Sequence, residues 1–247
     1  MAGAQVRQIA TTSGHVEVET WPTANGALHR AVVTGGSTED VADALTAECP
    51  AGTALLVDRE DLMLALRDRG STMVRHLHAM RHRLIAMPDS DVPGTFTLRP
   101  WRSGDGDALA AAYLDAYGPG HPDARSGGLA DAALELTRMA EDPDNPRIAE
   151  ACAVLDVDGE PVGCALVLRS AYFRGFAGPW LMNVFRSPGP RAKGAGEVLV
   201  IAAMHALHEA GEGGLGLAVT HANTGARAVY ERLGFEYALQ GWVVVTA

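Results

Sequence analysis

Cysteine, lysine and long apolar runs are all scarce in this chain of 247 residues. The cysteines are Cys49, Cys152 and Cys164, which are far apart and form no C-x-x-C pair. Their odd number and wide spacing argue against a disulfide scaffold and a structural zinc site. No apolar run approaches the ~18 residues of a membrane-spanning helix, and the first residues lack a signal-peptide core. We therefore expect a cytoplasmic location and no membrane partner.

Positive charge is limited as well. Lys193 is the single lysine, and the net charge is −10. A surface of this sign repels phosphate backbones, which argues against a nucleic-acid partner. The hydrophobic content of 47% is enough for a folded core, which excludes disorder over most of the chain.

A linker at residues 87–94, M-P-D-S-D-V-P-G, divides the chain because it combines proline and aspartate without apolar periodicity. Before it, strand and helix patterns alternate, with helix caps expected at Ser37 or Thr38 and at Asp58. The predicted elements are strands at 15–21, 28–34, 53–57 and 71–85 and helices at 38–47 and 59–69. We interpret residues 1–90 as a small α/β unit.

Residues 94–247 form the second predicted unit. Asp105 or Asp107 is expected to open its first helix, and Asp158-Gly159 is a strong signal for a hairpin turn. The other predicted elements are strands at 95–99, 151–157, 162–169, 180–185, 214–220 and 235–245 and helices at 129–140, 196–210 and 224–233.

The segment R-A-K-G-A-G, from Arg191 to Gly196, lies between a predicted strand and a predicted helix. Glycines allow backbone N–H groups to turn toward an anion, and a helix N-terminus adds positive potential. A plain helix start explains the glycines equally well. The segment fits neither a P-loop nor a dinucleotide fingerprint, because no Lys-Ser/Thr follows and the third glycine is missing.

A second segment, H-A-N-T-G-A-R-A-V-Y-E-R-L-G-F, runs from His221 to Phe235. It places Tyr230 about two helical turns beyond Asn223. Alone, the segment is also consistent with an ordinary amphipathic helix that ends at Gly234.

Together, in this order, the two segments resemble the GNAT superfamily of acyl-CoA-dependent N-acyltransferases. The family's Arg/Gln-x-x-Gly-x-Gly/Ala loop matches at Arg191, Gly194 and Gly196. Its Asn-x-x-Ala-x-x-x-Tyr-x-x-x-Gly-Phe element matches at Asn223, Ala226, Tyr230, Gly234 and Phe235. The resemblance covers about 150 residues from Thr95 onward.

The resemblance implies an α/β (α+β) fold: a mixed, mostly antiparallel sheet flanked by helices, whose strands at 180–185 and 214–220 splay apart. It further implies acetyl-CoA as acyl donor, with Tyr230 as the general acid for the departing thiolate. The acetyl carbonyl would accept a backbone N–H near Asn183–Phe185. The implied cofactor-binding residues are Asn183, Val184, Phe185, Arg186, Arg191, Ala192, Lys193, Gly194, Ala195, Gly196, Asn223, Ala226 and Tyr230.

Two departures from the family pattern concern the strand at 180–185. It carries no carboxylate where many members have a glutamate base, and Arg186 follows it where the family usually has an aliphatic residue. His221 is the main candidate for a base, although it also suits a purely structural role in the turn. The weaker candidates are Asp115, Glu135 and Glu150.

One histidine pattern and one tyrosine pattern each allow both a structural and a functional role. His76, His78 and His82 share one face of a strand by their period of two, but no cysteine or carboxylate completes a metal site, so no metal is expected. Tyr113 and Tyr117, at i and i+4 on one helix, belong either to the core or to an acceptor pocket.

The first unit resembles a shortened, degenerate copy of the second half of a GNAT domain, because it lacks the arginine-bearing loop, the asparagine and the tyrosine. We therefore expect a tandem GNAT-like chain that transfers an acetyl group from acetyl-CoA to a primary amine of a small molecule. The alternatives are a non-catalytic acyl-CoA sensor and a protein-lysine or N-terminal acetyltransferase. A homodimer is compatible with the sequence.

Overall fold

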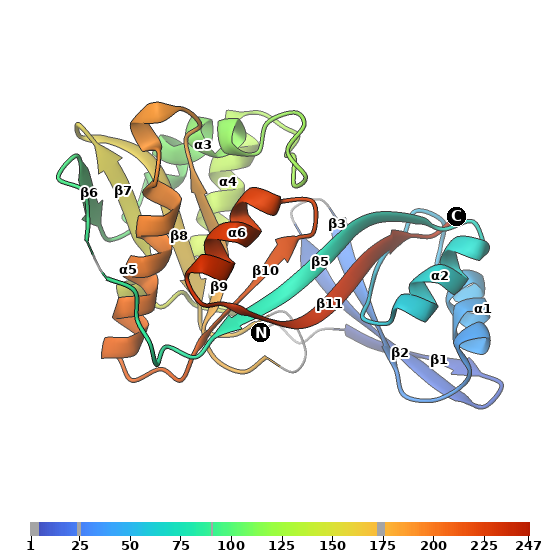
Figure 1. Ribbon diagram of the computed structural model, residues 1–247. Coiled ribbons are helices and arrows are strands. Elements are labelled where there is room, and N and C mark those ends of the chain that lie inside the picture. Colours follow the sequence, from blue (N-terminus) through green and yellow to red (C-terminus); the bar gives the residue numbers. More distant parts are fainter. Residues whose placement is uncertain (1–4, 24–25, 90, 172–175) are drawn as a thin grey trace. The chain divides into compact units, whose positions relative to one another are not determined.

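The computed structural model describes residues 5–23, 26–89, 91–171 and 176–247 and divides the chain into two compact units (Figure 1). The first unit contains the residues up to His78 together with Thr220–Ala222 and Ala238–Ala247. The second contains Ala79–Val219 and Asn223–Tyr237. This division differs from the expected boundary near residue 90, because two long strands contribute residues to both units. No helix in the described part of the chain is long and apolar enough to cross a membrane.

The first unit is an α/β fold in which antiparallel strands lead into two helices. Its elements are β1 (Gln5–Thr11), β2 (Gly14–Thr23), β3 (Gly26–Val33), α1 (Thr38–Glu48), β4 (Ala54–Val57), α2 (Glu60–Asp68) and β5 (Thr72–His82). Its core joins the helices to the strands through Val16, Leu45, Leu55 and Leu66. Strand β1 was not anticipated, because only Ile9 of its seven residues is buried and the apolar alternation is therefore weak.

One of the two expected helix caps in this unit is confirmed and the other is wrong. Ser37 is the N-cap of α1, and its side chain accepts a hydrogen bond from the Asp40 backbone N–H at 3.1 Å. Helix α2 instead begins after Arg59, which makes no capping hydrogen bond, so Asp58 is not its cap.

The second unit contains a mostly antiparallel sheet with helices, as expected. Its elements are β6 (Phe96–Arg99), α3 (Asp105–Ala116), α4 (Leu129–Ala140), the 3₁₀ turn η1 (Ala149–Ala151), β7 (Ala153–Val157), β8 (Glu160–Leu168), β9 (Trp180–Arg186), the 3₁₀ turn η2 (Pro190–Ala192), α5 (Ala195–Glu209), β10 (Leu215–Thr220), α6 (Thr224–Arg232) and β11 (Glu236–Val245). In Figure 1, α5 crosses in front of β7 to β9, whereas α3 and α4 lie behind them. Strands β6 to β9 pair antiparallel, and β9 pairs parallel with β10.

Local sequence signals account for the turn between β7 and β8 and for the start of α3. Asp158 and Gly159 both have positive φ, 52° and 83°, which is the backbone that a tight hairpin between β7 and β8 requires. Asp105 begins α3 as expected, but the N-cap is Gly104. The buried Asp105 carboxylate instead accepts two hydrogen bonds from Arg99, at 2.8 and 2.9 Å, and so ties β6 to α3.

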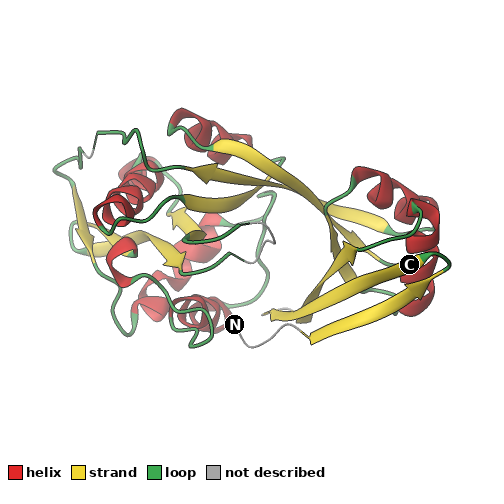
Figure 2. Cartoon of the chain, turned by 90° about the horizontal axis from the view of Figure 1, so that it is seen from below, coloured by secondary structure: helices red, strands yellow, loops and turns green. Residues whose placement is uncertain are grey.

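Both units contain the same order of elements around one parallel strand pair. In the first unit β3, α1, β4, α2 and β5 follow each other, with β3 parallel to β4. In the second unit the order is β9, α5, β10, α6 and β11, with β9 parallel to β10. The final strand of the second series enters the first unit, where Trp242 pairs with Val57 of β4 (Figure 2 colours the strands yellow).

Candidate functional site

The loop before α5 forms an exposed helix N-terminus. Gly194, at φ 88°, is the N-cap in the left-handed region that glycine adopts without strain. The first intrahelical hydrogen bond of α5 runs from Val198 N–H to Gly194 O, at 3.2 Å. The preceding N–H groups of a helix have no intrahelical acceptor and carry the positive end of the helix dipole. Such groups bind anions.

Space beside this loop is open. A Cβ atom added at Gly194 or Gly196 would meet no other atom within 4 Å. Ala192 and Ala195 are buried and anchor the loop to the core, whereas Lys193 is exposed. The loop therefore combines an anchored backbone with open space at its two glycines.

The arginines near the loop are used in part to hold its backbone. Arg191 Nη2 donates to Val157 O at 2.6 Å and lies 3.2 Å from an Asp158 carboxylate oxygen. Arg186 Nη1 donates to Ser187 O at 2.8 Å. Both guanidinium groups thus face protein oxygens in this structure.

The strand that leads into the loop separates from its neighbour. The parallel register of β9 and β10 consists of Gly216 opposite Trp180 and Leu217 opposite Leu181, although both strands continue beyond these pairs. On the β8 side, the register shifts by one residue between Leu181 and Asn183, which leaves Met182 as a bulge. Within the described residues, the backbone of β9 from Asn183 onward is thus unpaired on its β10 side.

Asn183 is buried on β9 and is held by Tyr117 from the end of α3. The Tyr117 hydroxyl donates to Asn183 Oδ1 at 2.8 Å and lies 3.3 Å from Val184 O. Tyr113, one helical turn earlier, is fully buried and packs edge-on against Phe185, with ring centroids 5.1 Å apart. Tyr113 is thus a core residue, while Tyr117 places its hydroxyl against the backbone of β9.

Helix α6 positions Tyr230. Asn223 is its N-cap, and Asn223 Oδ1 accepts a hydrogen bond from Ala226 N–H at 3.2 Å. Tyr230 is buried against Phe235, with ring centroids 5.7 Å apart. Burial raises the pKa of the Tyr230 phenol above its ordinary value, and the charge of Asp123 raises it further. Tyr230 is therefore protonated at neutral pH.

The loop between α3 and α4 places Asp123 near Tyr117 and Tyr230, and sequence reasoning missed this residue. Burial is the main cause that raises the pKa of Tyr117 well above its ordinary value, while Tyr230 and Asp123 add smaller contributions. His121 Nδ1 accepts from Asp123 N–H at 2.9 Å, and His121 Nε2 lies 3.4 Å from Asn223 Nδ2. Only the position of this loop over both tyrosines identifies Asp123, because its surrounding sequence carries no motif.

Of the carboxylates that the sequence offered as weaker bases, Glu135 lies beside Tyr113. Glu135 pairs with Arg125 at 3.3 Å, and Asp115 and Glu150 are exposed. His221 belongs to the first unit, where it meets His76 and His78. His82, by contrast, lies in the second unit, where its ring packs against Phe235.

Known proteins resemble this chain in sequence or in fold. A mycothiol acetyltransferase from Nocardioides sp. is 31% identical over 182 residues, which are 70% of this chain and 61% of the relative. The chain therefore spans less than two thirds of that relative's length. Among solved structures, a GCN5-related N-acetyltransferase from Kribbella flavida matches with a TM-score of 0.63 and 19% identity, over 98% of this chain and 90% of the other.

A tandem GNAT protein from the clavulanic acid biosynthesis pathway also shares the fold, with a TM-score of 0.56 and 14% identity over 100% of this chain and 83% of the other. The family model described as the acetyltransferase (GNAT) family matches residues 112–235. This range includes the loop before α5, Asn183, Asn223 and Tyr230. The chain belongs to the GNAT acetyltransferase family.

Proposed function

We propose that this chain is an N-acetyltransferase that moves the acetyl group of acetyl-CoA to a primary amine of a small molecule. The observation that carries the proposal is the parting of β9 from β10, with β9 leading directly into the open helix N-terminus at Gly194. The unpaired backbone of β9 runs into the anion-binding loop before α5. This arrangement suits an extended donor with a pyrophosphate at one end.

The donor would be held mainly by backbone groups. The N–H groups of the loop and first turn, from Lys193 to Glu197, would receive the pyrophosphate. Glu197 carries a negative charge in this turn, but its carboxylate pairs with Arg232 at 2.7 Å. A backbone N–H near Asn183–Phe185, with Val184 N–H on the side of β9 that faces away from β8, would donate to the acetyl carbonyl oxygen and stabilise the negative charge that develops on it.

The transfer needs one proton donor and one proton acceptor. The amine nitrogen bonds to the acetyl carbon, the carbon–sulfur bond breaks, and the amine loses a proton. Tyr230 keeps its phenolic proton at neutral pH, which suits it to protonate the departing sulfur. His221 stays our predicted acceptor of the amine proton. Asp123 is the second candidate for that role, since its charge acts on both Tyr117 and Tyr230.

The first unit is proposed to be a degenerate copy that binds no donor. Its loop at Gly35–Ser37 follows a strand of the parallel pair, as the loop before α5 does. A Cβ atom added at Gly36 would approach Thr11 Oγ1 to 2.9 Å, so Thr11 occupies the space that is open at Gly194. The Ser37 side chain also satisfies the Asp40 N–H.

A small cationic amine is the favoured acceptor, because the net charge of −10 attracts cations. The test measures release of free thiol from acetyl-CoA with a panel of small amines. The panel should include the acceptor of the mycothiol acetyltransferase that this chain resembles, and lysine-bearing peptides should be assayed beside it. Calorimetry should give one acetyl-CoA per chain.

Turnover with one or more small amines supports the proposal. Binding without turnover on any amine would favour the non-catalytic sensor, and turnover restricted to peptides would favour a protein acetyltransferase. A stoichiometry of two would show that the loop of the first unit is competent.

A further inference from the structure

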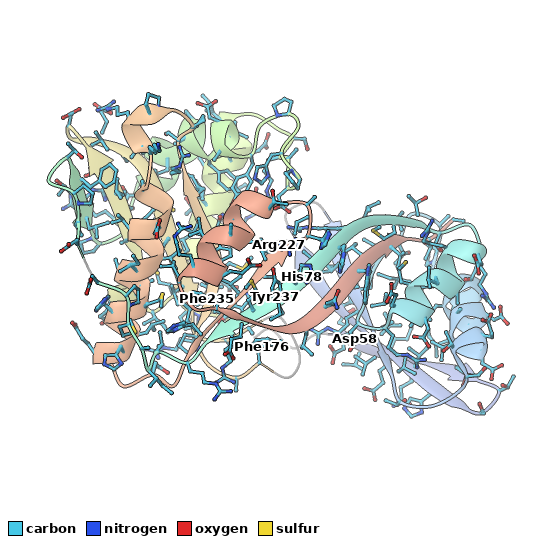
Figure 3. The ribbon with its side chains drawn as sticks, in the orientation of Figure 1. Asp58, His78, Phe176, Arg227, Phe235 and Tyr237 are labelled. Carbon is cyan, nitrogen blue, oxygen red and sulfur yellow. The ribbon has the colours of Figure 1, made fainter. Side chains whose placement is uncertain are left out.

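Three imidazole rings meet on one face of the first unit. His76 and His78 are two residues apart on β5 and therefore point to the same side of the sheet. His221 directly follows β10, and its backbone N–H donates to His76 O at 2.8 Å. One ring nitrogen from each of the three histidines lies within 4.8 Å of the other two. Figure 3 labels His78 of this group.

Stacking and a hydrogen bond hold the His76 ring in place. It stacks on His221, with centroids 4.7 Å apart, and on Trp242, with centroids 5.1 Å apart. His76 Nε2 lies 2.9 Å from Gln240 Oε1. An amide oxygen only accepts hydrogen bonds, so Nε2 carries the proton and Nδ1 keeps its lone pair. A hydrogen bond of this kind, from the second ring nitrogen to an oxygen, is what metal-ligating histidines usually make.

The spacing of the nitrogens is compatible with one shared ion. His78 Nε2 and His221 Nδ1 are 2.8 Å apart and share a hydrogen bond, so the ring that donates it must move this proton to its other nitrogen before both can bind an ion. Tetrahedral zinc, with Zn–N bonds of about 2.0–2.1 Å, places two ligand nitrogens about 3.3 Å apart. The distances within the cluster, from 2.8 to at most 4.8 Å, lie on both sides of that value. Small side-chain rotations would therefore bring three nitrogens to one ion.

Burial gives the cluster a closed side and an open side. His78 is buried, His76 is half-buried and His221 is exposed. An ion held by these rings would keep a fourth position toward solvent for water. Imidazole alone, without carboxylate or carbonyl oxygens, favours zinc, copper and nickel over calcium and magnesium.

We propose that His76, His78 and His221 bind one divalent transition-metal ion, with zinc as the expected occupant. The ion would join the middle of β5 to the end of β10 and thereby stabilise the first unit. A His221 ring that binds the ion through Nδ1 carries its proton on Nε2, so in the metal-bound chain Asp123 and not His221 would accept the amine proton. The histidine pattern along β5 alone did not predict this site, because the third ligand comes from a residue 143 positions after His78.

The test is a titration of the metal-free full chain with Co²⁺, followed by visible absorption, and then displacement by Zn²⁺. We expect saturation at one ion per chain with the intense bands of a tetrahedral site. His221→Ala is the first variant, because the side chain of His221 is exposed and the change leaves the core of the unit intact. His76→Ala is the second, and both should bind at least ~10-fold more weakly, since even loss of an outer hydrogen bond costs 10–100-fold.

Two further variants test whether Co²⁺ binds at the three-histidine cluster or at other histidines of the chain. Gln240→Ala removes only the hydrogen bond to His76 and should weaken binding by ~10–100-fold. His15→Ala, on β2 in the same unit, is the matched control and should bind Co²⁺ as the unchanged chain does. Zn²⁺ should also raise the melting temperature of the unchanged chain and not that of His221→Ala. Absence of saturable binding, or equal binding by His221→Ala and the unchanged chain, would overturn the proposal.

Discussion

Tyr117, at the end of α3, donates its hydroxyl proton to Asn183 Oδ1 on β9 at 2.8 Å. Asn183 begins the stretch of β9 whose backbone is unpaired toward β10. The hydrogen bond therefore fixes a side chain beside the proposed acetyl position and restrains the strand that would bind the donor. Asn183 Nδ2 also contacts Met139 Sδ of α4, at 3.8 Å, so both helices hold the same amide.

Tyr117→Phe should destabilise the second unit and impair turnover. The change keeps the ring contacts with Tyr113 and His121 but leaves Asn183 Oδ1 without its donor. A buried polar atom left without its partner typically costs about 1–3 kcal/mol. Urea unfolding should show a loss in this range, and kcat should fall by more than the donor affinity does. Unchanged stability would mean that water replaces the hydroxyl.

Gly196→Glu should abolish binding of acetyl-CoA without harming the fold. Gly196 has an ordinary φ, and an added Cβ meets nothing within 4 Å, so a side chain fits there. A glutamate in the first turn is compatible with the helix dipole. Its carboxylate would nevertheless occupy the proposed pyrophosphate position, and such like-charge contacts cost several kcal/mol. Calorimetry should show a loss of affinity of at least ~100-fold.

Gly213→Glu is the control for that experiment. Gly213 lies in the same unit after the C-terminal end of α5, outside the proposed donor-binding residues, and it too has an ordinary φ and open space around its Cα. The control should retain most of its affinity for acetyl-CoA. Equal loss in both variants would point to a general charge effect and would contradict the assignment of the loop.

Tyr230→Phe should lower turnover far more than it weakens donor binding. The phenyl ring keeps the packing against Phe235, whereas the proton that the sulfur requires is lost. General acid catalysis is typically worth ~10²–10⁴-fold, so kcat should fall within that range. Single-turnover rates at saturating amine would measure it. Full turnover under conditions where chemistry limits the rate would rule out this role.

The sequence predicted most of this architecture because its signals are local. The helix start after the loop motif, the helix start at Thr224 and the Asp158-Gly159 turn each depend on adjacent residues, and the structure forms all three as expected. The pairing of Tyr117 with Asn183 joins positions 66 apart, and no local pattern encodes it. The motif likewise identified Arg191, but it did not predict where the guanidinium group points. In the structure this group donates a hydrogen bond to Val157 O.

His82 should make stability depend on pH. It is buried in the second unit, and its Nδ1 accepts from Leu84 N–H at 2.9 Å. Burial lowers the pKa of His82 below 6.5, partly opposed by Glu236. Well above pH 6.5, His82 is neutral in both the folded and the unfolded chain. As the pH falls below 6.5, His82 binds a proton more readily in the unfolded chain than in the folded chain. The free energy of unfolding therefore decreases as the pH approaches the lower pKa of the folded chain.

The variant His82→Asn keeps an acceptor for Leu84 N–H but does not titrate. Its free energy of unfolding should therefore decrease less steeply between pH 7 and 5 than that of the unchanged chain, by up to about 1.4 kcal/mol per pH unit. Urea unfolding across this range compares the two slopes. Equal slopes in the two proteins would mean that His82 does not contribute to the pH dependence of the free energy of unfolding.

The final prediction concerns where the chain can be cut, because β5 and β11 each contribute residues to both units. Met80 and Leu84 precede the linker in sequence but are fully buried in the core of the second unit. Trp242 and Val244, near the C-terminus, are buried in the core of the first unit. A fragment of residues 94–247, cut at the linker, would lose Met80 and Leu84 and expose Trp242 and Val244.

A fragment of residues 79–237 keeps the apolar residues of the second unit and omits those of the first. We expect it to unfold cooperatively and to melt at a higher temperature than residues 94–247. Loss of a buried Leu or Met side chain typically costs about 2–5 kcal/mol, so the difference should be large. Calorimetry of both fragments at equal concentration measures it. Equal melting temperatures would show that the linker at 87–94 is the true folding boundary and that Met80 and Leu84 contribute little to the core.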